Sequence, residues 1–162
     1  MTSTRLFPSL ILAACVGALA SALTAQYGFG LRPCALCLYQ RVPYVLAGLL
    51  AAIALLPAVP VRGKALLAAL CALVFLANTG IAVFHVGVEH HWWAGLAACT
   101  GGAPQAQTVA QLKAMLAGPP PPRCDQVPWA LFGISMAGYN VFASLALALF
   151  AGWAASRLTR AA

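Results

Sequence analysis

The sequence predicts an all-α integral membrane protein, a four-helix bundle with two outward loops. Two observations support this fold class. Hydrophobic residues make up 63% of the 162-residue chain and charged residues only 7%, which is too few for the surface of a soluble domain. Four apolar runs approach the ~20 residues that a helix needs to cross a hydrocarbon layer of ~30 Å. Helices satisfy their own backbone hydrogen bonds in lipid, so four spans indicate a helical bundle.

The four runs are expected to form one domain, 1–162. They cover about residues 6–27, 42–59, 65–88 and 129–153. The first run also resembles a secretory signal, because Arg5 precedes it and the small-residue segment SALTAQ follows. Its apolar stretch is longer than the ~7–15 residues of a typical signal core, which favours a span.

The charge distribution predicts how the bundle is oriented. An even number of spans puts both termini on one side, together with the short turn between the second and third spans. That side carries no acid and five basic residues in short segments: Arg5, Arg62, Lys64, Arg157 and Arg160. The positive-inside rule therefore predicts cytoplasmic termini. Basic residues scattered beside apolar runs indicate a lipid bilayer as partner and no nucleic acid.

The two outward loops, residues 28–41 and 89–128, contain four of the six cysteines. The first loop holds one pair and the second loop another, and an oxidising compartment favours disulfide chemistry for both. The remaining two, Cys15 and Cys71, fall within spans. Buried cysteine often behaves as a small hydrophobic residue, so we interpret these two as packing residues.

Cys34 and Cys37 form a Cys-x-x-Cys pair that can close a disulfide or act as a dithiol. At the start of a helix, unpaired amides and the helix dipole stabilise a thiolate, here on the second cysteine. Arg41 stands four residues after Cys37, so a helix that begins here places both on one face. A fixed positive charge favours the thiolate form of a nearby sulfur. The pattern therefore indicates a reactive sulfur.

A disulfide that is used must be reoxidised, and the sequence limits the source of oxidising power. It has neither a glycine-rich nucleotide fingerprint nor a cluster-type cysteine run. A quinone dissolved in the membrane fits, because it takes two electrons and Arg41 could donate hydrogen bonds to its carbonyl. Cys99 and Cys124 are far apart in a polar loop, which predicts the mobility that exchange with a soluble partner needs.

Three segments resemble the signatures of the disulfide bond formation protein B family: PCALCLYQR, FHVGVEHHWWAGLAACTG and PRCDQVPWALFGISMAGYN. The resemblance covers nearly the whole chain, with the motifs in the right order. It implies a thiol:quinone oxidoreductase of the bacterial inner membrane. Such a protein would reoxidise a periplasmic thioredoxin-like thiol oxidase similar to DsbA and pass the electrons to the membrane quinone pool, either ubiquinone or menaquinone.

The resemblance also implies roles for four catalytic cysteines. Cys99, paired with Cys124, would form the mixed disulfide with the partner. Cys124 would exchange with Cys34, and Cys37 would then be the thiolate that faces the quinone.

Two further residues correspond to the quinone site of the family. Arg41 matches its arginine, and His85 falls where the family has a histidine. Gln40 departs from the family pattern, which commonly has an acidic residue before the arginine. That departure leaves the acidic contribution to proton handling open.

Other interpretations of the same residues stay open at this point. The four loop cysteines could bind zinc or form two static disulfides, which would make the chain a non-catalytic four-span scaffold or a metal-binding protein. We expect no metal, because structural zinc sites usually combine two close-spaced pairs. A quinone-linked reductase of the vitamin K epoxide reductase type would carry its active Cys-x-x-Cys in a late span, whereas the pair here precedes the second span, which argues against this type. Arg41 could only snorkel to the interface, and HHWW at 90–93 is typical of an aromatic belt.

The second loop and the last span contain three further features. A short amphipathic helix is expected before Gly118, with one apolar face made of Val109, Leu112, Met115 and Leu116. The tetraproline at 119–122 should be extended. Tyr139 and Asn140 are expected to form hydrogen bonds between helices.

Overall fold

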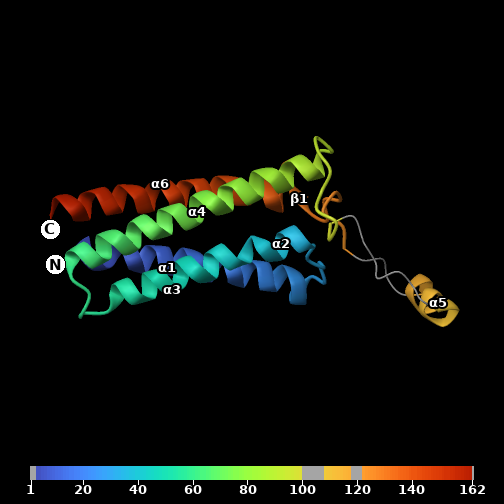
Figure 1. Ribbon diagram of the computed structural model, residues 1–162, viewed down its shortest axis with the longest axis horizontal. Coiled ribbons are helices and arrows are strands. Elements are labelled where there is room, and N and C mark those ends of the chain that lie inside the picture. The colour runs from blue at the N-terminus through green and yellow to red at the C-terminus, as the bar shows by residue number, and fades with distance from the viewer. Residues whose placement is uncertain (1–2, 100–107, 118–121, 162) are drawn as a thin grey trace.

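The computed structural model describes residues 3–99, 108–117 and 122–161 and confirms the predicted fold class. Within these residues, four helical segments are long and apolar enough to cross a membrane: Thr4–Gly28, Ala35–Leu55, Val61–Glu89 and Met136–Arg160. They run side by side, and both ends of the chain lie at the same end of the bundle (Figure 1). We call this the terminal end, and the opposite one, where Cys34, Cys37, Cys99 and Cys124 lie, the cysteine end.

The first segment changes its geometry where it reaches the cysteine end. Helix α1 (Ser3–Leu23) continues into a π-helical turn, η1 (Thr24–Gly28). Gly30 follows with φ of 68°, a conformation that glycine adopts without a steric cost. Single π turns occur frequently at functional sites, and this one lies beside the cavity described below.

The second segment is broken at Gln40 into α2 (Ala35–Tyr39) and α3 (Arg41–Leu55). Pro43 explains the break, because proline has no amide hydrogen to donate to the carbonyl of Tyr39 four residues earlier. Gln40, at the break, is only 7% exposed. The proline therefore brings a polar side chain into the interior of the bundle.

The core of the bundle is built from small side chains. The longest helix, α4 (Val61–Glu89), packs mainly on α6 (Met136–Arg160), and α3 packs between α1 and α4. Alanines fill the contacts: Ala47, Ala51, Ala54, Ala65, Ala68, Ala151 and Ala154 are at most 4% exposed. Large apolar side chains point outward instead, with Leu73 62% and Leu149 67% exposed. This arrangement suits lipid, where close backbone approach drives helix association.

Two helical segments begin at other positions than the expected spans. The second helical segment begins at Ala35 and not near residue 42, so Cys37 and Arg41 belong to helices. The last helix begins at Met136 and not at residue 129, because a small antiparallel hairpin precedes it, β1 (Ala130–Leu131) and β2 (Ile134–Ser135). Its turn, Phe132–Gly133, has φ of 51° and 78°, and two positive values are typical of a tight hairpin turn.

The short helix expected in the second loop is present as α5 (Val109–Ala117). The side chains of Leu112, Met115 and Leu116 lie outside the described residues, as do Gly118 and the tetraproline up to residue 121. The apolar face of α5 and the extended tetraproline therefore stay predictions.

Candidate active site at the cysteine end

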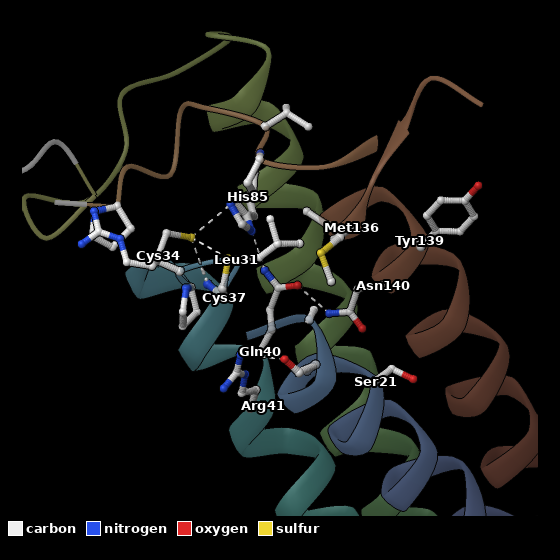
Figure 2. A pocket seen from close by; sticks show the side chains of 18 of the residues that line it. Ser21, Leu31, Cys34, Cys37, Gln40, Arg41, His85, Met136, Tyr139 and Asn140 are labelled. Atoms are coloured by element: carbon white, nitrogen blue, oxygen red, sulfur yellow. Dashed lines mark hydrogen bonds between the residues drawn. The ribbon is translucent and has the colours of Figure 1, made fainter. Parts of the chain in front are cut away.

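Cys34 and Cys37 are placed for disulfide chemistry by the start of α2. Cys34 caps this helix, and its sulfur accepts a hydrogen bond from the backbone amide of Cys37 at 3.3 Å. The two Sγ atoms are 2.7 Å apart, and Figure 2 shows both side chains beside His85. Cys34 is only 4% exposed. The two sulfur atoms are therefore close enough to form a bridge with each other.

The structure favours Cys34 as the charged sulfur of the dithiol. Hydrogen bonding from the Cys37 thiol lowers the pKa of Cys34 to about 4, and His85, with Nε2 at 3.6 Å, adds to the effect. Burial of Cys34 opposes both by disfavouring the charged form. The sequence predicted the thiolate on Cys37, which holds the proton in this arrangement. The role of Cys37 towards a quinone stays a prediction.

The second pair is bonded. Cys99 forms a disulfide with Cys124, the pairing that the family resemblance implies. Contrary to the polar, mobile surroundings that we expected, these residues are 1% and 0% exposed and share a buried cluster with Cys34, Leu36 and Val88. Apolar packing at the end of α4 explains the burial. The fold therefore brings the disulfide against the dithiol, although the two pairs lie in different loops of the sequence.

A cavity of about 780 Å³ lies beside the dithiol. Cys34, Cys37, Arg41 and His85 line it from the start of the second segment and from α4. Further residues of α1, α6 and both loops at the cysteine end complete the lining. Cavities of ~300–1,000 Å³ with apolar walls and a few polar groups are typical of small-molecule sites. Of the six residues that the sequence singled out, these four meet here, whereas Cys99 and Cys124 lie outside the lining.

Arg41 is held at the side of the cavity by the end of the first helical segment. Its Nη1 donates to Oε1 of Gln26 at 2.7 Å, and its Nη2 reaches the carbonyl of Ala22 at 3.5 Å. Gln26 belongs to the π-helical turn η1. A guanidinium group carries five N–H donors, so Arg41 keeps donors for a ligand while these two contacts fix its position.

His85 lies between the dithiol and a buried amide. Nε2 of Gln40 donates to Nδ1 of His85 at 2.8 Å, and the histidine is only 4% exposed. Gln40 in turn accepts a hydrogen bond from Nδ2 of Asn140 on α6. Because Nδ1 accepts, the proton of the neutral imidazole is on Nε2, which faces Cys34 (Figure 2). His85 is therefore a hydrogen-bond donor to the sulfur.

The hydrogen bonds continue from Gln40 into the span. Asn140 accepts hydrogen bonds from the hydroxyls of Tyr44 at 2.6 Å and Ser144 at 3.1 Å, and Nδ2 of Asn78 donates to Ser144 at 2.8 Å. The expectation that Asn140 bonds between helices is confirmed. Tyr139, by contrast, donates to the carbonyl of Leu131 in the hairpin.

Sequence analysis missed two contributors to this site. Gln40 was noted only as a departure from the family pattern, and Glu89 was only the first residue of the expected second loop, 89–128. Glu89 is the last residue of α4, with a side chain 4% exposed and Oε1 3.9 Å from Nε2 of His85. The i, i+4 spacing of His85 and Glu89 was the available signal, because such residues share a helix face.

The geometry argues against a zinc site. Cys34, Cys37 and His85 bring three possible ligand atoms within 4.8 Å of one another. A metal-bound histidine donates its other ring N–H, whereas Nδ1 of His85 accepts from Gln40. A site of four thiolates is also incompatible with the bond between Cys99 and Cys124.

Comparison with known proteins now assigns the chain. The sequence profile described as "Disulfide bond formation protein DsbB" matches residues 4–154. The chain belongs to the disulfide bond formation protein B family. A protein of that name from Aromatoleum aromaticum is 30% identical over 155 residues, covering 92% of this chain and 90% of its own. One from Xylella fastidiosa (strain Temecula1) is 32% identical over 142 residues, covering 83% and 80%. No solved structure matches significantly.

Membership of the disulfide bond formation protein B family agrees with the geometry of the cysteines. The chain is a multi-pass membrane protein with four apolar helices. Its activity class is that of a disulfide oxidoreductase that supports disulfide bond formation. One bonded pair and one adjacent dithiol, in contact through a buried cluster, are the parts that thiol–disulfide exchange requires.

Proposed function

We propose that this protein reoxidises a periplasmic, thioredoxin-like dithiol oxidase and passes the electron pair to a membrane quinone. The partner's dithiol would reduce the Cys99–Cys124 disulfide through a mixed disulfide on Cys99. Cys124 would then exchange with the Cys34–Cys37 pair. Each exchange breaks one S–S bond and forms another, so that the partner's two electrons end on Cys34 and Cys37. One proton stays on Cys37 and the other is released to solution, because Cys34 is held as a thiolate.

The observation that carries this proposal is the order of the cysteines in space. A second cavity of about 310 Å³ lies beside Cys99, with Trp93 and His91 in its lining. The disulfide is next, in the buried cluster that includes Cys34. Cys37 follows, on the larger cavity with Arg41 and His85. A partner on one side and an acceptor on the other would thus be linked by sulfur atoms alone.

The larger cavity suits a quinone as the electron acceptor. Residues from α1, such as Ala18 and Ala22, line it opposite Asn140 and Ala143 of α6, and these two helices contact each other only sparsely. Arg41 and His85 are the residues that would hold the quinone oxygens. When bound, a quinone supplies the capacity to accept the two electrons of the dithiol together with two protons.

The charge pattern supports an inner-membrane location with cytoplasmic termini. The terminal end carries five basic residues and no acid, whereas the chain's two acids, Glu89 and Asp125, belong to the cysteine end. The positive-inside rule then puts the cysteine end in the periplasm, where disulfides persist.

Quinone reduction by the purified protein tests the proposal. The protein in lipid nanodiscs would be mixed with a reduced thioredoxin-like dithiol protein and a water-soluble quinone, and the quinone absorbance followed. Wild-type protein should turn over, and Cys37→Ser should abolish turnover. Cys71→Ala is the matched control, because Cys71 is buried within α4, away from both pairs, and it should keep the wild-type rate. Turnover by Cys37→Ser would refute the route, and zinc bound to the purified protein would favour the metal-binding alternative.

A further inference from the structure

Glu89 lines the larger cavity, and the proposed electron route gives it no role. Its Oε1 is 3.9 Å from Nε2 of His85, and its Oε2 accepts a hydrogen bond from the hydroxyl of Ser135, the N-cap of α6. The carboxylate also lies within electrostatic reach of the Cys37 thiol. With a side chain only 4% exposed, Glu89 is a buried acid in a chain that has only two acidic residues.

Closing the Cys34–Cys37 bridge requires that the thiol of Cys37 lose its proton. His85 cannot take this proton in the arrangement shown. Its Nδ1 accepts from Gln40, so its Nε2 already carries a hydrogen and donates. Asn140 prevents Gln40 from turning round, because its Nδ2 donates to the oxygen of Gln40. The hydroxyl of Tyr44 and that of Ser144 hold Asn140 in turn.

The other titratable groups on the cavity are also unsuited to accept a proton. Arg32, Arg41 and Arg123 line it, and guanidinium groups stay protonated in proteins. Two tyrosines line it as well, and their hydroxyls act as donors, Tyr44 to Asn140 and Tyr139 to the carbonyl of Leu131. Among the described residues that line the cavity, Glu89 is the one carboxylate.

We propose that Glu89 is the proton acceptor of the dithiol, taking the proton of Cys37 while His85 holds the negative charge on Cys34. The inference rests on the proposed function. As the S–S bond between Cys34 and Cys37 forms, its two electrons pass to the quinone. The quinone takes up two protons, one from Cys37 by way of Glu89 and one from solution, because Cys34 is already a thiolate. A negative carboxylate becomes neutral as the neighbouring sulfur becomes negative, so the net charge of the buried site does not change in this step.

The test measures closure of the bridge without quinone. Reduced protein carrying Cys99→Ser and Cys124→Ser would be mixed with diamide, a soluble azo compound that accepts two electrons and two protons. Formation of the Cys34–Cys37 disulfide would be followed by rapid quenching and mass spectrometry between pH 5 and 9. General bases contribute ~10²–10⁴-fold to rates. Glu89→Gln should therefore slow closure about 100-fold at pH 7, and its rate should keep rising with pH where the wild-type rate is level.

Two further variants separate a proton acceptor from a structural contact. Gln at position 89 can still accept the hydrogen bond from Ser135, so loss of that contact does not explain slow closure. Glu89→Asp retains a carboxylate and should restore most of the rate and the level pH profile. Asp125→Asn neutralises the chain's other acid and should match the wild type.

Two results would overturn the inference. One is a Glu89→Gln variant with the wild-type rate and pH profile. The other is equal slowing in Glu89→Gln and Glu89→Asp with no change in the profile, which indicates a structural role. Because diamide replaces the quinone, failure of the proposed function would appear separately, as wild-type protein that closes its bridge with diamide but does not reduce quinone.

Discussion

The charge on Cys34 leads to a prediction about the alkylation of the reduced protein. Three donors approach its sulfur: the Cys37 thiol at 2.7 Å, the Cys37 amide at 3.3 Å and Nε2 of His85 at 3.6 Å. They lower its pKa to about 4, so the sulfur should be a thiolate above that pH and lose its reactivity below it. An ordinary cysteine, with a pKa of ~8.5, is only about 0.3% thiolate at pH 6.

The pH at which the alkylation rate of Cys34 reaches half its maximum is more informative than the alkylation rate itself. At pH 6 the thiolate fraction of Cys34 would exceed that of an ordinary thiol about 300-fold. Intrinsic nucleophilicity falls with pKa, with a Brønsted coefficient of ~0.4–0.5, and over ~4.5 units this removes about 100-fold. The net gain at pH 6 is only about threefold, whereas the midpoint should lie several pH units below that of a free thiol.

The assay is iodoacetamide labelling of the reduced protein between pH 3 and 9, with the labelled residue identified by peptide mass. The Cys99→Ser, Cys124→Ser background removes the second pair, and the same protein unfolded in denaturant gives the reference midpoint. Label should appear first on Cys34, with a midpoint near 4. Replacing His85 by leucine should raise the midpoint, because one donor is lost. A midpoint above 7, or initial labelling of Cys37, would refute the assignment of the charge.

Three other substitutions test the cavity and the fold. Arg41→Lys keeps a positive charge but cannot reproduce both contacts of the guanidinium group. The KM for a soluble quinone should rise about tenfold, which corresponds to the loss of one hydrogen bond to a charged group. An unchanged KM would exclude Arg41 from quinone binding. Ala151→Leu adds volume at a position with 0% exposure and should lower the free energy of unfolding by about 1–3 kcal/mol, measured by detergent titration in mixed micelles. Phe132→Asn should raise the free energy of unfolding by about 1 kcal/mol, because Phe132 is 90% exposed and has φ of 51°, a conformation that asparagine tolerates better. A loss of stability would mean that Phe132 makes contacts that outweigh its backbone strain.

The local sequence was sufficient for the elements with a strong local signal. Four apolar runs predicted the four helices, because burial in lipid demands length and apolarity and little else. The Cys-x-x-Cys pair with Arg41 four residues later predicted a shared site, and these three residues line one cavity. The start of a helix differed from the expected start of the span where a short segment of other structure precedes or interrupts an apolar run. Trp129 and Leu131 extend the last run in composition, yet residues 130–135 form a hairpin.

The environment of the sulfur atoms was beyond the reach of local patterns. Polar mobile surroundings were expected for Cys99 and Cys124, because their loop is polar in sequence. Burial of this pair depends on Val88 at the end of α4 and on Cys34 in another loop, and no local pattern encodes such a meeting.

Taken alone, the sequence determined that this chain has four helices long and apolar enough to span a membrane and a Cys-x-x-Cys pair four residues before an arginine, because hydropathy and short spacings are local properties. Only the tertiary structure placed His85 and its hydrogen-bond partners beside Cys34. Gln40 meets His85 across 45 residues and Asn140 across 100, and these contacts fix where the imidazole proton resides. Hydrogen bonds depend on distance and direction in space, so partners on different helices become apparent only after the helices have packed.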